Sequence, residues 1–422
     1  MKDYDMIIVG AGIAGLRVAL ETKKLNSKAK ILILEKYEKA GGRMQTIHTE
    51  VNNKKIQYES GAGRISIHHK KLLKLIHDYN LTPIPISKDI LWRPYGSKES
   101  APNTFESIWL EICEYLDSLP TDIKRKKTLR DLAIEVLGVD LAKSLLETYP
   151  YRAEIEVSSA ESAIDLYKSI GDSSFYVLKE GFSSLIEKML RDVKDHNIEI
   201  EYHNTVNRID VKGKDKKYSV LSEKGNKYHT YIASRVVLAV HRNALQGIYP
   251  FSQEHPLVKA VKMEPLLRIY SVYKDATWFP SAHVVTNSPL RNIIPINKST
   301  GLIMSSYLDA RDIELWTDIY KKGKTQELKD KVHNDTLALF PELDIKEKPI
   351  HVFSEFWHDG CSYWTTNTNY KKLSQEALQP YPITYPNLHI VGESFSKKPQ
   401  WIEGALEHVD ELISLIKHVL SY

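Results

Sequence analysis

The chain has 422 residues, of which 42% are hydrophobic and 27% are charged, and its formal net charge is +4. A chain of this length forms two or three domains with sizeable cores, while so small a net charge argues against a nucleic-acid partner. Two cysteines provide neither a disulfide framework nor a metal cluster, no apolar run is long enough to cross a membrane, and the N-terminus lacks a signal-peptide pattern, so we expect a cytosolic protein without a metal.

The first elements predict a βαβ unit. Residues 5–9 (DMIIV) and 30–34 (KILIL) are short apolar runs typical of buried strands, and the apolar positions of residues 15–25 repeat with a helical period. A strand, a glycine turn, a helix and a strand in this order predict two parallel strands in a sheet that helices cover.

A glycine-rich stretch, GAGIAG at 10–15, joins the first strand to the first helix. It matches the pattern G-x-G-x-x-G, in which the first glycine makes a tight turn, the second lets a diphosphate approach, and the third lets helix and strand pack closely. Free N–H groups at the helix start favour phosphate, and Glu35, at the end of the second strand, is placed to accept hydrogen bonds from ribose hydroxyls. The cofactor-binding residues predicted here are Gly10, Gly12, Ile13, Ala14, Gly15, Glu35 and Lys36.

Residues 68–170 predict mainly helices. In 103–119 the apolar residues fall on one helical face, and the first residues of this stretch have capping-box spacing. Gly138 and Gly171 follow helical stretches and suit C-terminal caps. We therefore expect an all-helical insertion after the first βαβ unit.

The remainder of the chain alternates between strand and helix patterns. The predicted elements are a helix at 181–195, strands at 198–203, 206–211, 217–232 (around a turn at Lys224–Asn226) and 235–240, a strand-rich region at 266–300, a helix at 325–340, a short strand at 389–393 and a helix at 403–420. The last strand, turn and helix repeat the pattern of the first, which predicts two domains that are each assembled from separated segments.

A second glycine pair, in GGRMQT (41–46), follows Glu35. Together the stretches GAGIAGL and LEKYEKAGGRMQT resemble the signature of the FAD-dependent amine oxidase family, which includes monoamine oxidases and L-amino-acid oxidases. The resemblance implies that Gly41 and Gly42 approach the pyrophosphate of FAD and that Arg43 pairs with it. FAD is thus the expected cofactor.

The C-terminal stretch HIVGESFSKKPQWIEGALEHVDELI (389–413) resembles the closing element of the same family. The resemblance implies that a Gly-Glu pair meets the ribityl–phosphate part of FAD, and that QWIEGA (400–405) runs along the flavin with a helix whose positive end faces it. It adds the following residues to the predicted cofactor-binding set: Val206 (at the adenine), Gly392, Glu393, Trp401, Ile402 and Ala405.

The resemblance spans nearly the whole chain and is looser at 67–177. It implies an α/β + α+β fold, with a Rossmann-like FAD-binding domain of the GR2 type and a discontinuous substrate-binding domain of mixed sheet and helical insertion. We assign residues 1–66, 178–248 and 384–422 to the FAD-binding domain, 67–177 to the helical subdomain and 249–383 to the substrate-binding domain.

The stretch YESGAGRISIHH (58–69) carries the substrate prediction. Small residues allow close approach, and a neighbouring arginine can hold an anion with two parallel hydrogen bonds. In the family that the chain resembles, an arginine at this point binds the substrate carboxylate of L-amino-acid oxidases, and amine and polyamine oxidases usually lack it. The resemblance implies that Gly61, Ala62 and Gly63 lie along the flavin and that Arg64 meets both cofactor and substrate.

Within the family the chain resembles the L-tryptophan oxidase type of bisindole biosynthesis, through ESGAGRIS, VTNSPLRNI, SSYLDARDIELW, SEFWHDG and QWIEGAL. That type surrounds its substrate with an arginine, a lysine and a tyrosine. Arg64 matches the arginine, and Tyr307 matches the tyrosine and would donate to the carboxylate beside it. Arg268 stands where most of the family has a lysine that holds a water near the flavin and helps oxygen to react.

Three roles are open for Arg268, because an arginine stays protonated and presents a planar fork. It could stabilise superoxide, pair with a second substrate carboxylate, or fill the site, and an ion pair within a sheet is the structural alternative. Trp401 matches a flavin-facing aromatic position, and Tyr363 and Trp364 are candidates for the other side, with core packing equally favoured. Cys361 lies near the point where monoamine oxidases attach FAD, although a buried structural thiol is the preferred interpretation.

The predicted function is FAD-dependent oxidation of an L-amino acid, aromatic or bulky, by hydride transfer from Cα to flavin N5, with oxygen as acceptor and an imino acid and hydrogen peroxide as products. Two alternatives stay open, an amine or polyamine oxidase in which Arg64 serves only FAD, and a non-catalytic flavin-binding protein. A homodimer is compatible with the sequence. The predicted catalytic residues are Arg64, Arg268, Tyr307 and Trp401, and residues of the helical insertion that could reach the site are His68, His69, Tyr149 and Arg152.

Overall fold

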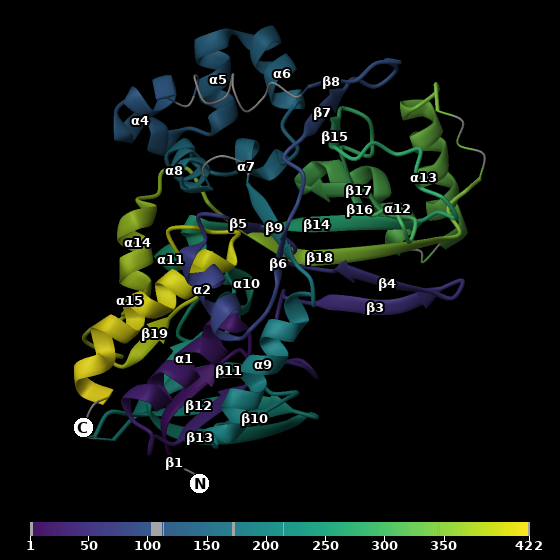
Figure 1. Cartoon of the computed structure of the whole chain (residues 1–422). Helices are drawn as coiled ribbons and strands as arrows, with labels where there is room; N and C mark the ends of the chain where they lie inside the picture. The colour runs from purple at the N-terminus through teal and green to yellow at the C-terminus, as the bar shows by residue number, and fades with distance from the viewer. Residues whose placement is uncertain are drawn as a thin grey trace.

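The computed structural model describes residues 3–420 except 103–111, 113, 171–173, 214, 322, 324, 344 and 346. Two large sheets carry most of the strands, a group of short helices lies beyond the second sheet, and both termini lie at the end that the first sheet occupies (Figure 1). Among the described helices, none is both long and apolar enough to cross a membrane.

The first sheet contains the predicted βαβ unit. Its strand order is β10-β2-β1-β13-β12-β11, and β19 also pairs with β13. β1 is parallel to β2 and β13, so the carboxyl ends of these three strands meet at one edge, whereas β12 runs antiparallel to its neighbours. The strands are β1 (Asp3–Val9), β2 (Ile31–Leu34), β10 (Glu199–Glu201), β11 (Thr205–Lys212), β12 (Lys217–Lys224), β13 (Lys227–Leu238) and β19 (Leu388–Ile390).

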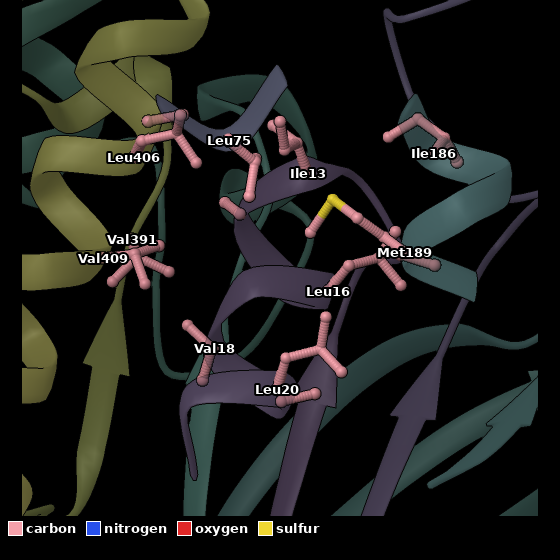
Figure 2. Packing of buried hydrophobic residues seen from close by; sticks show 14 of the residues in the cluster. Ile13, Leu16, Val18, Leu20, Leu75, Ile186, Met189, Val391, Leu406 and Val409 are labelled. Carbon is pink, nitrogen blue, oxygen red and sulfur yellow. The ribbon is translucent and has the colours of Figure 1, made fainter. Parts of the chain in front are cut away.

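Four of the described helices contribute to the core on one face of this sheet. α1 (Ile13–Leu25) lies between α9 (Phe182–Asp195) and α15 (Ile402–Leu420), and α2 (Lys70–Asp78) packs on α15. Figure 2 shows Leu16 of α1 beside Met189 of α9, both fully buried. This packing holds the N-terminus of α1 over the carboxyl end of β1, which positions the glycine-rich loop.

The second sheet has the order β18-β14-β17-β16-β15-β7-β8. Its core side packs on α12 (Glu314–Lys321) and α13 (Thr325–Leu339), around the fully buried Trp316. The strands are β7 (Ile90–Arg93), β8 (Ala101–Pro102), β14 (Val261–Val272), β15 (His283–Thr286), β16 (Asn292–Asn297), β17 (Leu302–Asp309) and β18 (His351–Trp364), with the 3-10 helix η1 (Ala310–Ile313) after β17.

Smaller elements connect the two sheets. β3 (Thr46–Val51) and β4 (Lys54–Glu59) form a hairpin, and β5 (Ile65–Ser66) and β6 (Pro83–Pro85) both pair with β9 (Phe175–Leu178). The remaining described helices are α4 (Thr121–Lys126), α5 (Leu129–Leu137), α6 (Val139–Glu147), α7 (Arg152–Glu156), α8 (Ala160–Ile170), α10 (Arg242–Gln246), α11 (Pro256–Ala260), α14 (Tyr370–Ala377) and the 3-10 helix η2 (Glu393–Phe395).

The expected all-helical insertion is only partly correct. Residues 121–170 do form helices α4 to α8, and Gly138 ends α5 as expected, with φ +78°. Before them the chain forms the strands β6, β7 and β8. The apolar run ILWR of β7 becomes a strand because it pairs in parallel with HVVT of β15, and β8 then pairs with β7, so both extend the second sheet. Most of the helix predicted at 103–119, and the cap predicted at Gly171, fall outside the described residues.

Candidate functional site

The glycine-rich loop lies at the carboxyl edge of the first sheet, between β1 and α1. Gly10 has φ +102°, and a Cβ at Gly10 would meet the carbonyl oxygen of Ala239 at 2.5 Å. A Cβ at Gly15 would collide with the carbonyl oxygen of Gly10. These two glycines therefore serve the close turn and the close packing that the sequence predicts for them.

Gly12 has a different environment, because a Cβ there would meet no atom within 4 Å. It pairs as an isolated parallel bridge with Gly41 of the second glycine pair, and the Gly41 N–H donates to the Ala11 carbonyl at 2.9 Å. A Cβ at Gly42 would touch only the Gly12 Cα, at 3.7 Å. Both loops thus leave bare backbone beside the N-terminus of α1, where free N–H groups of Ile13 and Ala14 suit a diphosphate.

Glu35 follows β2 at the same edge and is 6% exposed. Its carboxylate accepts hydrogen bonds from the N–H groups of Ala11 at 2.7 Å and Tyr37 at 2.9 Å, which fix its orientation next to the loop. The Asn204 N–H donates to the Glu35 carbonyl at 2.8 Å, and this contact brings the start of β11, with Val206, to the same place. Lys36 is exposed and its ammonium lies over the Tyr37 ring at 5.5 Å.

Arg43 and Glu393 join the second glycine pair to the C-terminal segment. Nη2 of Arg43 donates to the Glu393 carboxylate at 2.5 Å, and Nη1 donates to the Gly360 carbonyl at 3.0 Å. The same carboxylate accepts from the Ser362 hydroxyl and from the Gln400 N–H. Burial raises the pKa of Glu393, but Arg43 and these donors outweigh burial and hold that pKa below its ordinary value. The expected pairing of Arg43 with phosphate stays a prediction.

The segment before α15 completes this edge. Gly392 has φ +128°, and a Cβ there would meet no atom within 4 Å, so its backbone is bare like that of Gly12. Ala405 is buried and Ile402 packs against the same cluster as α1. Glu403 anchors the first turn of α15, since its carboxylate accepts from the N–H groups of Lys71 and Leu72 on α2, both at 2.9 Å. The bare glycines and the helix start together fit FAD.

The GAGR segment runs directly against the second glycine pair. The Ala62 N–H donates to the Arg43 carbonyl at 2.9 Å, and a Cβ at Gly61 would collide with that carbonyl. Gly63 faces the other way, since a Cβ there would lie 3.5 Å from Nη1 of Arg268. Residues 61–63 therefore lie between the second glycine pair and Arg268 of the second sheet, and their contact with the flavin stays a prediction.

Arg64 is half-buried and lies among aromatic rings. Its Nη2 donates to the hydroxyl of Tyr151, and its guanidinium carbon lies 5.6 Å from the centre of the Tyr151 ring and 5.0 Å from the centre of the Phe175 ring. Phe175 stands on β9 opposite Ser66 and stacks on Trp401 at 6.1 Å, with the ring planes 10° apart. Phe175 thus links two residues that were predicted separately, Arg64 and Trp401.

Arg268 lies on β14, opposite Tyr307 on β17, and is 6% exposed. Its Nη1 donates to the backbone carbonyls of Glu59, at 3.0 Å, and Gly61, and its Nη2 donates to the Tyr307 hydroxyl at 3.3 Å. The guanidinium carbon lies 4.7 Å from the centre of the Tyr307 ring. Arg268 therefore contacts backbone carbonyls of residues 59 and 61 and a tyrosine, and within the described part of the chain it forms no ion pair with a carboxylate, unlike the ion-pair alternative.

The remaining candidates near the flavin, Tyr363, Trp364 and Cys361, are at most partly exposed to solvent. Trp364 is fully buried and donates from Nε1 to the Ser396 carbonyl at 2.9 Å, which fits core packing. Tyr363 is 2% exposed. Burial raises the pKa of Cys361 to about 12, so this residue remains a thiol, and nothing in its contacts tests a covalent link to FAD.

Of the candidates in the predicted helical insertion, His69 and Tyr149 make ring contacts near the site and Arg152 forms an ion pair. His69 is 3% exposed and lies edge-on to Trp401, with 4.7 Å between the ring centres, and burial lowers its pKa to about 3, so it is neutral. The ring of Tyr149 is edge-on to Tyr151 at 5.7 Å. Arg152 pairs with Asp312 at 3.4 Å instead of reaching Arg64.

Sequence reasoning missed Tyr151 and Phe175. Two nearby residues, Tyr149 and Arg152, were named as candidates, but no periodic pattern in the sequence distinguishes Tyr151 from them. Phe175 follows residues that lie outside the described part of the chain, on a strand that the sequence analysis did not predict. A strand pattern in FYVL at 175–178 was the available signal.

Comparisons with known proteins agree with this geometry. The model of the family described as flavin containing amine oxidoreductase matches residues 13–408. Among solved structures, a putrescine oxidase bound to putrescine has a TM-score of 0.76 at 14% sequence identity, covering 98% of this chain and 99% of that one. A variant of putrescine oxidase from a redesign of cofactor binding has a TM-score of 0.78 at 15% identity, covering 99% of both chains.

The family match confirms the predicted family, the expected cofactor FAD and the class of reaction, oxidation at a CH–NH2 or CH–NH group. The structural likeness confirms the mixed fold with a Rossmann-like FAD-binding domain. The chain belongs to the flavin-containing amine oxidoreductase family.

Proposed function

We propose that this enzyme oxidises the α-amino group of an L-amino acid. The observation that carries the proposal is the position of Arg64, which is half-buried, hydrogen-bonded to Tyr151 and continuous with residues 61–63, whose backbone packs on the second glycine pair. A guanidinium in an aromatic environment binds a carboxylate more strongly than one in water, because the surroundings screen its charge less.

Bound FAD would supply a two-electron acceptor for the hydride from the substrate Cα, and with oxygen as the final acceptor the products would be an imino acid and hydrogen peroxide. In our proposal the carboxylate is held by Arg64 and Tyr307, and this fixes the direction of the Cα–H bond. No base is assigned, because an amine that has lost its proton to solvent can react. The residues proposed to hold FAD are those of the glycine-rich loop, Glu35, the second glycine pair, Val206, residues 61–63, and Gly392 to Ala405.

The surroundings of Arg64 support an aromatic or bulky side chain on the substrate. Tyr151, Tyr307, Phe175 and Trp401 contribute rings near this arginine, and stacked or edge-on contacts between rings add to the binding of an aromatic ligand. Of the three roles left open for Arg268, its contacts favour filling the site, because its Nη groups donate to two backbone carbonyls and to Tyr307.

A second candidate substrate is a diamine. Glu154 and Asp309 are 5% and 3% exposed, and burial raises the pKa of each to about 7. A buried carboxylate near the site could bind an ammonium group, and the similar solved structures are putrescine oxidases. The contact of Arg64 with Tyr151 favours the amino acid, since a diamine offers that arginine no anion.

Anaerobic reduction of the bound flavin separates the candidates. The holoenzyme is mixed with each of the twenty amino acids, with their decarboxylated amines and with putrescine, and loss of flavin absorbance is followed. Reduction by one or more amino acids supports the proposal, reduction by amines alone favours the diamine candidate, and no reduction by any of these compounds favours the non-catalytic alternative. A cytosolic location, a homodimer and the two-domain boundaries stay predictions.

A further inference from the structure

Two arginine–tyrosine pairs lie side by side at the candidate substrate site. Arg64 donates to the Tyr151 hydroxyl, and Arg268 donates to the Tyr307 hydroxyl at 3.3 Å. The two phenol rings meet edge-on, with 5.5 Å between their centres and 72° between their planes. Tyr151 and Tyr307 are each half-buried, so neither residue is fully enclosed in the core.

Each of these hydroxyls retains its own hydrogen for a further acceptor. A phenol oxygen that accepts a hydrogen bond from an arginine directs its own O–H elsewhere. Among the residues that the structure describes, none accepts a hydrogen bond from either hydroxyl. Burial raises the pKa of Tyr151 to about 12, so its phenol stays protonated and remains a donor at neutral pH.

Asp309 connects the two chain segments that carry Tyr151 and Tyr307. It follows Tyr307 by two residues at the end of β17, is 3% exposed, and accepts hydrogen bonds from the N–H groups of Arg152, at 2.8 Å, and Ala153, at 3.1 Å. These two residues come directly after Tyr151 and begin α7. The end of β17 therefore sets the position of Tyr151 relative to Tyr307.

We propose that Tyr151 is a substrate-binding residue whose hydroxyl donates to the substrate carboxylate next to Tyr307, and that Asp309 is the positioning residue that holds it there. This inference rests on the proposed amino-acid substrate. Two O–H donors, each polarised by an arginine, match the two oxygens of one carboxylate and would distinguish an amino acid from its decarboxylated amine.

The test measures anaerobic flavin reduction by the twenty amino acids and their decarboxylated amines in the holoenzymes of wild type, Tyr151→Phe and the control Tyr228→Phe. Tyr228 is 68% exposed on β13 of the first sheet, whereas Arg268 and Tyr307 belong to the second sheet. Phenylalanine at 151 keeps the ring contacts and removes only the hydroxyl. The loss of one hydrogen bond to a charged group raises the apparent Kd of each reactive amino acid about 10- to 100-fold, with little change in the limiting rate and in the Kd of any amine.

Three outcomes are distinct. A rise in Kd for amino acids alone, absent in Tyr228→Phe, supports the inference. Equal behaviour of Tyr151→Phe and Tyr228→Phe towards amino acids overturns the role of Tyr151 and leaves the proposed function intact. A wild type that only amines reduce overturns both.

A second variant tests the positioning role. Asp309→Ala frees the N–H groups of Arg152 and Ala153 and should raise the Kd for amino acids in the same direction as Tyr151→Phe. Asp309→Asn keeps an acceptor and should restore at least part of the affinity. A Kd that stays at the wild-type value in Asp309→Ala, in a holoenzyme with full FAD content, contradicts this role.

Discussion

Tyr151 and Tyr307 meet edge-on although they are far apart in the sequence, one in the connection before α7 and the other on β17. Each accepts a hydrogen bond from a different arginine, Arg64 or Arg268. This contact joins the helical insertion, the GAGR segment and the second sheet at one point, and it identifies that point as the candidate substrate site.

Gly12 should be required for FAD binding but not for folding. Its φ is −73°, which any residue adopts, and a Cβ there enters open space, so Gly12→Val should leave the thermal midpoint of the apoprotein unchanged while reducing FAD affinity at least 10-fold. Flavin titration of apoprotein, followed by fluorescence, measures that affinity. In Gly15→Ala the new methyl group collides with the Gly10 carbonyl, so this variant should lose stability even without FAD.

Arg268 should contribute to the stability of the fold as well as to the position of Tyr307 at the candidate substrate site. Arg268→Met removes the donors to the Glu59 and Gly61 carbonyls, and we expect the free energy of unfolding to fall by about 2–3 kcal/mol, measured by urea denaturation. The control Arg208→Met removes an arginine on β11 that is about half exposed and pairs with Asp210, and it should lower stability much less than Arg268→Met does. Equal losses in the two variants would contradict the role of Arg268 in holding the GAGR backbone.

The stability that the Arg43–Glu393 pair contributes should require both residues. Glu393→Ala leaves the half-buried Arg43 with the Gly360 carbonyl as its remaining acceptor among the described residues, and losing a hydrogen bond between charged groups costs about 1.5–3 kcal/mol of folding free energy. Arg43→Ala should cost a similar amount. The double variant should lose clearly less than the sum, and losses that simply add in this double-mutant cycle would show that the pair is not coupled.

Asp309 should make stability fall as the pH rises. Its native pKa is about 7, above the value of about 3.9 for an unfolded aspartate, so between these values the native state binds more protons than the unfolded state. The stabilising contribution of the protonated form is therefore present below pH ~4 and is lost as the pH rises through 7. Asp309→Asn cannot titrate, and its stability relative to wild type should rise between pH ~4 and 7 in urea denaturation at several pH values. The exposed Asp195→Asn is the control, and parallel pH profiles of Asp309→Asn and wild type would contradict the prediction.

The sequence predicted the fold around the two glycine-rich stretches well, because the signals for that fold are local. The glycines of GAGIAG lie within the βαβ unit and those of GGRMQT follow shortly after its second strand, and backbone conformation and close backbone approach determine what each glycine does. The C-terminal helix was also predictable, since a strand, a turn and a helix follow each other without interruption.

The substrate half depended on contacts between distant segments. Tyr151 meets Arg64 across 87 positions of the chain, and no pattern of spacing indicates such a contact. The strands β6 to β8 were missed for a related reason, since ILWR becomes a strand through pairing with β15, almost two hundred residues later. The contacts of Arg268 likewise follow from its position opposite Tyr307 in the second sheet.

The most direct test of a carboxylate-binding Arg64 is stopped-flow reduction of the flavin in wild type and Arg64→Ala, with an amino acid that reduces the wild type and its decarboxylated amine. Loss of the charged contact with the carboxylate, together with the polarisation of Tyr151, predicts a fall of at least 100-fold in the second-order rate of reduction by the amino acid, with FAD content retained and the rate for the amine unchanged. Reduction of Arg64→Ala by the amino acid at the wild-type rate would contradict the proposed role of this arginine.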